Sequence, residues 1–234
     1  MNDARTLMLR RIQAGLAVNG ALLEAQAAAF PPPHPQGPFS ITDLDVVGQF
    51  QAELTALHAQ VYLCDGADAA REQLLALVAA AQARQAITWA ASELPLPDVL
   101  PALQAAGVTL VDQQVLGLAD RALRYAELEA VPVCITGADA AIAESGTLLL
   151  VSGRGRGRLA SLLPAMHIAL LPVDRIVRTL PDALDLVRTR FGASVFQDRS
   201  NLTLITGPSR TADIELSLTL GVHGPRDIHV IVIR

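Results

Sequence analysis

The chain has 234 residues and a formal net charge of −5, with 51% hydrophobic residues but only 3% aromatic ones. This length is sufficient for one α/β domain with a sizeable core, which must be built from Ala, Leu, Val and Ile. The negative charge argues against a general nucleic-acid binder, because such proteins need a basic surface to neutralise phosphates.

All 18 basic residues are arginine, and the absence of lysine excludes two classes of enzyme. Enzymes that form a Schiff base on lysine are excluded, and so are P-loop NTPases, whose phosphate loop requires a lysine. No apolar run reaches the roughly 18 residues needed to cross a membrane. The first five residues are not followed by an apolar secretory segment, so we expect a cytoplasmic protein without a membrane span.

The two cysteines, Cys64 and Cys134, lie far apart and form no CxxC motif. This spacing is typical of buried thiols in a reducing compartment. Two isolated cysteines cannot hold a Cys₄ iron–sulfur cluster, and no pair of histidines with a third ligand has the spacing of a zinc site. We therefore expect no metal and no cofactor bound by this chain alone.

In chain order, residues 4–29 predict a helix, 30–40 a proline-rich crossing segment, and 42–58 a second helix. The predicted strands are 60–63, 86–90, 108–111, 131–135, 147–151, 168–171, 202–205 and 228–233. The predicted helices between them are 67–83, 97–106, 181–191 and 211–220. This alternation predicts a three-layer, mainly parallel α/β sheet, with residues 1–40 as an appendage and 41–234 as a single domain.

Open α/β sheets bind ligands beyond the carboxyl ends of their strands, and three segments could supply such a site. In the first, 134–153, a strand is followed by a short helical turn that Asp139 could cap, and then by Glu144, Gly146 and Thr147. Gly146 permits a positive φ and a close approach of ligand to backbone, and Glu144 could act as a base or nucleophile. The structural alternative is that Glu144 caps neighbouring amides and the glycine only turns the chain.

The second segment, 153–172, alternates arginine with glycine before a short helix and a strand. Arg154 and Arg156, together with amides freed by glycine, are groups that bind phosphate or carboxylate. A solvated basic loop is the alternative. His167 at the start of the strand is either a second catalytic candidate or a structural histidine.

The third segment, 202–233, predicts a strand, a polar loop and a helix that begins near residue 211. The predicted ligand contacts are Gly207, Ser209, Arg210, Thr211, Asp213 and His223. Hydroxyls and amides at a helix N-terminus beside an arginine form an anion cradle. The alternative is that Arg210 pairs with Asp213 or Glu215 and ties down the corner.

Three stretches, ITGADAAIAESGTLLLVS, SLLPAMHIALLP and GPSRTADIELSLTLGVHGPRDIHVIVI, resemble the lactate-utilisation protein C family. The resemblance implies a LUD domain with the fold of the NagB/RpiA/CoA-transferase-like proteins. It also implies one of three cooperating proteins that oxidise L-lactate to pyruvate, the other two being iron–sulfur proteins.

Two functions follow as alternatives. In the first, the chain is a ligand-binding or accessory subunit that takes a small anionic ligand and works with iron–sulfur partner proteins. In the second, it is an autonomous transferase or cyclo-ligase acting on a CoA- or nucleotide-like substrate, with Glu144 as nucleophile or base. The second rests on analogy between folds.

Overall fold

The computed structural model describes residues 2–29, 45–113, 120–199, 201–212, 218–221 and 224–234. The chain divides into two units, Met1–Thr42 and Asp43–Arg234. The first unit contains the helix α1 (Asn2–Ala29), which agrees with the predicted N-terminal helix. The predicted boundary between residues 40 and 41 falls outside the described residues and stays a prediction.

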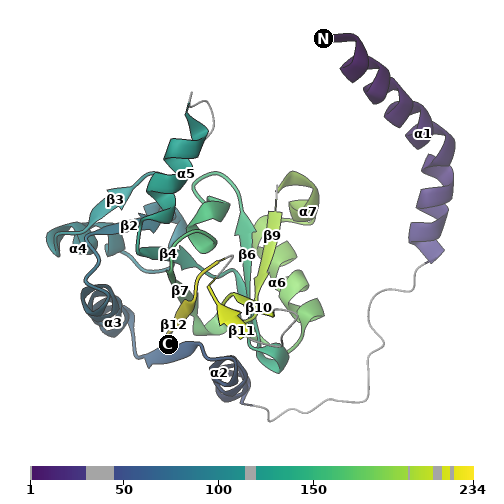
Figure 1. Ribbon diagram of the computed structural model, residues 1–234. Helices are drawn as coiled ribbons and strands as arrows, with labels where there is room; N and C mark the ends of the chain where they lie inside the picture. Colours follow the sequence, from purple (N-terminus) through teal and green to yellow (C-terminus); the bar gives the residue numbers. More distant parts are fainter. Residues whose placement is uncertain (1, 30–44, 114–119, 200, 213–217, 222–223) are drawn as a thin grey trace. The chain divides into compact units, whose positions relative to one another are not determined.

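Within the described residues, the second unit is built on a six-stranded sheet in the order β1-β12-β7-β4-β2-β3 (Figure 1). Every pairing in this sheet is parallel. Its strands are β1 (Gln60–Cys64), β2 (Gln85–Thr88), β3 (Thr109–Val111), β4 (Val133–Gly137), β7 (Met166–Pro172) and β12 (Asp227–Ile233). The predicted mainly parallel sheet is therefore confirmed.

Helices cover both faces of this sheet. They are α2 (Val46–Ala56), α3 (Ala67–Ala80), α4 (Val99–Ala105) and α5 (Arg121–Glu129). From β1 to β2 and from β2 to β3 the chain moves one way across the sheet, and from β3 to β4 it moves back. Right-handed crossovers therefore place α3 and α4 on one face and α5 on the other, which gives three layers (Figure 1).

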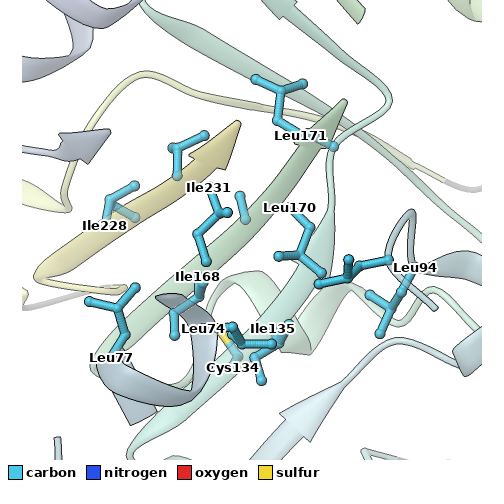
Figure 2. Packing of buried hydrophobic residues seen from close by; sticks show 14 of the residues in the cluster. Leu74, Leu77, Leu94, Cys134, Ile135, Ile168, Leu170, Leu171, Ile228 and Ile231 are labelled. Carbon is cyan, nitrogen blue, oxygen red and sulfur yellow. The ribbon is translucent and has the colours of Figure 1, made fainter. Parts of the chain in front are cut away.

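The main core lies between these layers and consists almost entirely of aliphatic side chains. Figure 2 shows Leu74 and Leu77 of α3 gathered with side chains of β4, β7 and β12, among them Ile135, Ile168 and Ile231. A strand covered on both faces needs apolar residues at successive positions, which explains the unbroken aliphatic runs in the sequence.

A second, four-stranded sheet in the order β8-β5-β6-β9 adjoins the first among the described residues. Its strands are β5 (Ala140–Ile142), β6 (Thr147–Ser152), β8 (Ile176–Val177) and β9 (Asn201–Ile205). The strands predicted at 147–151 and 202–205 are present as β6 and β9, but they pair antiparallel here, not in the parallel sheet.

Both faces of β6 are buried, because successive side chains alternate between two clusters. Leu148 and Leu150 enter the main core, whereas Leu149 and Val151 pack in a smaller cluster with α6 (Leu180–Phe191). The second sheet thus lies between α6 and the main core. Shorter helical elements are α7 (Val195–Asp198) and the 3₁₀ turns η1 (Ala91–Glu93), η2 (Ala143–Ser145), η3 (Arg158–Ser161) and η4 (Val173–Arg175).

The helix predicted over 211–220 is wrong. The described parts of this segment are two antiparallel strands, β10 (Arg210–Ala212) and β11 (Leu218–Leu220). From residue 213 to 220 the sequence alternates strictly between polar and apolar residues, a period of two that is typical of strands. Among the described residues, no helix is both long enough and apolar enough to span a membrane.

Candidate functional site

A cavity of about 910 Å³ lies at the carboxyl ends of β2 and β3. Its walls include Thr88 and Val111 from the ends of these strands, Arg121 and Tyr125 from α5, and Arg154 from the loop after β6. Parallel α/β sheets bind ligands at this edge, and small-molecule sites commonly enclose about 300–1,000 Å³. Both position and size therefore favour a ligand site.

The glycine–arginine loop, residues 153–157, is fastened against the end of β2. The Ala90 N–H donates to the Gly155 carbonyl over 2.8 Å, and the Trp89 indole N–H donates to the Gly157 carbonyl over 3.3 Å. Gly153 and Arg156 exchange backbone hydrogen bonds of 3.0 and 3.1 Å, and Gly155 has a φ of +74°. The loop is therefore a tight turn and one fixed wall of the cavity.

Gln113 joins this loop to the sheet from the end of β3. Its side-chain amide donates to the Thr88 carbonyl over 3.4 Å and accepts from the Ala160 N–H over 3.2 Å. A Cβ atom on Gly157 would lie 2.1 Å from the Gln113 Oε1 atom, so glycine is required for this close packing. Gln113 therefore holds two sides of the cavity together.

Arg156 points away from solvent and is only 5% exposed. Its guanidinium donates to both carboxylate oxygens of Asp139, over 2.7 and 2.8 Å, and to Glu93. The rings of Trp89 and Phe191 each lie with their centroids 4.9 Å from its Cζ atom. Burial alone would lower the pKa of Arg156, but the charge of Asp139 and the hydrogen bonds to both carboxylates raise it. Arg156 is therefore a buried cation whose ion pairs fix the glycine–arginine loop to the rest of the domain.

Further arginines surround the same carboxylate. Arg190 lies 3.8 Å from the Asp139 Oδ1 atom, and Arg175 donates to the Ala138 carbonyl over 2.8 Å. Burial, followed by the charge of Arg190, lowers the pKa of Arg175 to about 10. Asp139, which is fully buried, also accepts from the Val151 N–H over 2.8 Å. It is therefore the central counter-charge between the two sheets.

The cavity itself presents a mixed chemistry. Arg121 and Arg154 are exposed cations in its wall, and Asp112 supplies a carboxylate directly after β3. Leu110 and Tyr125 contribute apolar surface. Guanidinium groups bind phosphates and carboxylates through paired hydrogen bonds, so the site can hold an anion attached to an apolar body.

A family model described as the LUD domain matches residues 47–233 of this chain. The chain belongs to the LUD domain family. The match covers the whole unit that contains the parallel sheet and the cavity, apart from a few residues at its ends. The family predicted from the sequence is thereby confirmed.

Relatives named lactate utilization protein C are about 40% identical to part of this chain. The protein from Macrococcus caseolyticus is 41% identical over 109 residues, 45% of each chain. The Bacillus subtilis protein is 43% identical over 97 residues, which are 42% of this chain and 40% of that one. The Deinococcus radiodurans protein is 42% identical over 112 residues, 47% and 50% of the two chains. The chain thus spans at most half the length of these curated relatives.

A solved structure shares the fold. The crystal structure of a DUF162 family protein from Deinococcus radiodurans matches with a TM-score of 0.54 and 27% identity, covering 81% of this chain and 96% of that one. Together with the sheet order and the helices on both faces, this likeness confirms the predicted three-layer α/β fold class.

The two arginines predicted to bind a ligand have different surroundings in the structure. Arg154 is exposed and lines the cavity, as a ligand-binding residue must. Arg156, two residues later, is buried. It forms ion pairs with Glu93 and Asp139 that hold the glycine–arginine loop in place. Asp139, expected to cap a helical turn, precedes β5 and pairs with Arg156 instead.

Glu144 lies at the other end of β6 from the arginine loop. The six residues of β6 separate the two turns by about 17 Å, at a rise of roughly 3.3 Å per residue. Glu144 is exposed, and its N–H donates to the Arg178 carbonyl over 3.1 Å. Gly146 has the predicted positive φ, at +60°, but it is the backbone of Leu54 in α2 that approaches it. The predicted roles of Glu144 and Gly146 toward a ligand stay predictions.

His167 lies at the amino-terminal end of β7 and is completely buried. Its Nε2 atom is 2.8 Å from the Thr136 Oγ1 atom. Burial, and then the charge of His229, lowers the pKa of His167 to about 4, so the ring is neutral at neutral pH. It is not among the described residues that line the cavity, and its predicted catalytic role stays a prediction.

The third predicted segment, 202–233, contacts the first, 134–153, near the end of α2. The Thr147 Oγ1 atom lies 2.8 Å from that of Thr206, one residue before Gly207. Arg210 donates to the Leu57 carbonyl, and a Cβ on Gly207 would lie 3.0 Å from the Leu57 Cβ. These residues are thus brought together with Gly146, but at a different place from the cavity.

Ser209 and Thr211 make backbone contacts in the same region. The Ser209 N–H donates to the Pro225 carbonyl over 2.8 Å, and Thr211 is paired with Thr219 in the β10–β11 ladder. The predicted anion cradle needed a helix that begins near residue 211. Residues 210–212 form the strand β10 instead, so this backbone arrangement is wrong. Asp213 and His223 lie outside the described residues.

The sequence did not indicate that residues of α5 and β3 line the site, and the helix α5 itself was not predicted. Arg121 and Tyr125 belong to a helix whose first turn is capped by Asp120, which accepts from the Leu123 N–H over 3.0 Å. An aspartate directly before a run of charged and apolar residues at helical spacing is the signal that could have revealed this helix.

Proposed function

We propose that this chain is the ligand-binding component of an L-lactate utilisation system that oxidises L-lactate to pyruvate. The observation that carries the proposal is the 910 Å³ cavity with Arg154 in its wall, in a domain whose relatives are named lactate utilization protein C. A cationic group at the ligand-binding edge of the sheet suits the carboxylate or phosphate of an anionic ligand.

In this proposal the electrons of lactate pass to separate iron–sulfur proteins. Cys64 ends β1 and Cys134 lies in β4, with β12 and β7 between them. Three strand spacings of about 4.8 Å put the two strands roughly 14 Å apart. Burial raises the pKa of the Cys134 thiol well above its usual value, which disfavours the thiolate that ligates iron.

Anaerobic reconstitution of the isolated chain with iron and sulfide should leave it without a stoichiometric cluster. The measurement is iron and acid-labile sulfide per chain after desalting. The control is the same assay on a preparation that contains the partner proteins, where iron should be retained. One cluster per chain in the isolated protein would show that it carries electrons itself.

Arg154→Gln should impair growth on L-lactate while growth on pyruvate stays normal. The test strain lacks its own lactate utilization protein C and is complemented by this chain. Loss of a charged hydrogen bond costs about 1.5–3 kcal/mol, so ligand binding should weaken roughly ten- to a hundredfold. Arg154 is exposed, so the melting temperature should move by less than about 2 °C.

Arg158→Gln is the matched control, because it removes the same charge four residues further on and is not among the described cavity-lining residues. It should leave growth unchanged.

Glu144→Gln distinguishes the alternative of an autonomous transferase or cyclo-ligase, which needs this carboxylate. Normal growth of Arg154→Gln with loss of growth of Glu144→Gln would reject the proposed site.

A further inference from the structure

The cavity is far larger than an L-lactate ion requires. One water molecule occupies about 30 Å³ in the liquid, and a lactate ion displaces roughly three of them, or about 90 Å³. The cavity has a volume of about 910 Å³, close to ten times that of the ion. Ligand sites bury most of the surface of their ligand, so a cavity of this size fits a much larger molecule.

The wall of the cavity divides into an apolar part and a charged part. Leu100, Leu110 and Tyr125 come from α4, β3 and α5 and offer a surface for a flat, weakly polar group. Tyr125 is 44% exposed and lines the cavity, so part of the residue is open to a stacked group. Arg121 and Arg154 supply the cations. This combination favours a ligand with a planar ring at one end and an anion at the other.

A carboxylate and a fixed backbone complete the wall. Asp112 directly follows β3, and carboxylates near the ends of such strands accept hydrogen bonds from ribose hydroxyls. Gly155 and Gly157 line the cavity, and the absence of their side chains lets Ala90 and Gln113 pack against the backbone, which keeps this wall fixed.

From these features we infer that the cavity binds a nucleotide, with its base against Tyr125 and Leu110, its ribose near Asp112 and its phosphate at Arg121 and Arg154. The inference rests on the proposed function in that it assigns the ligand class of the same cavity. L-lactate by itself is then not the molecule that fills this site.

Trp89 provides an internal reporter of binding. It is the one tryptophan in the sequence, and it is 2% exposed. Its indole N–H donates to the Gly157 carbonyl, and Gly157 lines the cavity. A ligand seated against this loop changes the surroundings of the indole and hence its emission.

The experiment titrates the full chain with AMP, FMN and coenzyme A, and separately with orthophosphate and L-lactate. Binding is measured by isothermal titration calorimetry, with Trp89 emission as the second signal. At least one nucleotide should bind with a Kd at least a hundredfold below that of orthophosphate, since a stacked base alone contributes up to about a hundredfold. L-lactate should show no saturation up to about 10 mM.

Two variants test how the nucleotide is held. Tyr125→Ala should weaken the nucleotide about five- to a hundredfold and leave orthophosphate unchanged. Arg154→Gln should weaken both about ten- to a hundredfold, whereas Arg158→Gln should weaken neither. The inference is wrong if none of the three nucleotides binds below about 1 mM, or if Tyr125→Ala binds nucleotide as the unsubstituted chain does. Either result leaves the role in lactate utilisation intact, because the growth of Arg154→Gln on L-lactate tests that role independently.

Discussion

Asp139→Ala should lower the free energy of unfolding by about 3–5 kcal/mol, because it leaves the buried Arg156 cation without its main partner. The Arg156 guanidinium makes two hydrogen bonds to this carboxylate, over 2.7 and 2.8 Å, and has little access to water. The Val151 N–H loses its acceptor as well. At this chain length, about 1 kcal/mol moves the melting temperature by roughly 2–4 °C, so a fall of about 6–20 °C is expected.

Urea unfolding of three variants separates the buried ion pair from a general loss of charge. Asp139→Leu combined with Arg156→Met should recover much of the stability, because replacing both partners of a buried pair by apolar groups is often neutral. Asp185→Ala removes an exposed carboxylate that pairs with Arg188 over 2.7 Å, and should cost less than about 1 kcal/mol. A loss of stability in Asp139→Ala no larger than in Asp185→Ala would contradict this account of the pair.

The parallel sheet could be predicted because its strands are buried on both faces. The run 168–171 is aliphatic at every position and the run 228–233 at every position except His229, and they lie within β7 and β12 of the sheet. The short strand β5 (Ala140–Ile142) carries no such signal, since three small or aliphatic residues suit a helical turn equally well. Its conformation is decided by pairing with β6 on one side and with β8 on the other, and the residues of β8 are distant in sequence.

The site could be predicted only in part, because one motif contains side chains with opposite surroundings. Arg154 and Arg156 have the same neighbours in the sequence, yet one lines the cavity and the other is buried. The surroundings of the two arginines differ because Arg156 donates to Asp139 and Glu93, which belong to other parts of the chain. Such a partner becomes visible only when the order of the strands is known.

Gly146→Ala should destabilise the domain by about 2–5 kcal/mol. The residue has a φ of +60°, where an L-residue costs about 1–2 kcal/mol. An added Cβ would lie 2.6 Å from the backbone nitrogen of Leu54 and 2.9 Å from its Cα, so α2 would have to move. Overpacking of this kind adds about 1–3 kcal/mol. The expected fall in melting temperature is about 4–20 °C, measured by circular dichroism.

Gly107→Ala is the control that isolates the contact with α2. Gly107 also has a positive φ, at +81°, but a Cβ there would meet only the Arg84 Nη1 atom, at 3.8 Å. It should therefore show the backbone cost of about 1–2 kcal/mol without the overpacking term. Because Leu54 is completely buried, α2 cannot shift away from Gly146 without opening the core around that side chain. Equal destabilisation by the two substitutions would mean that α2 yields freely, and that Gly146 is needed for its backbone conformation alone.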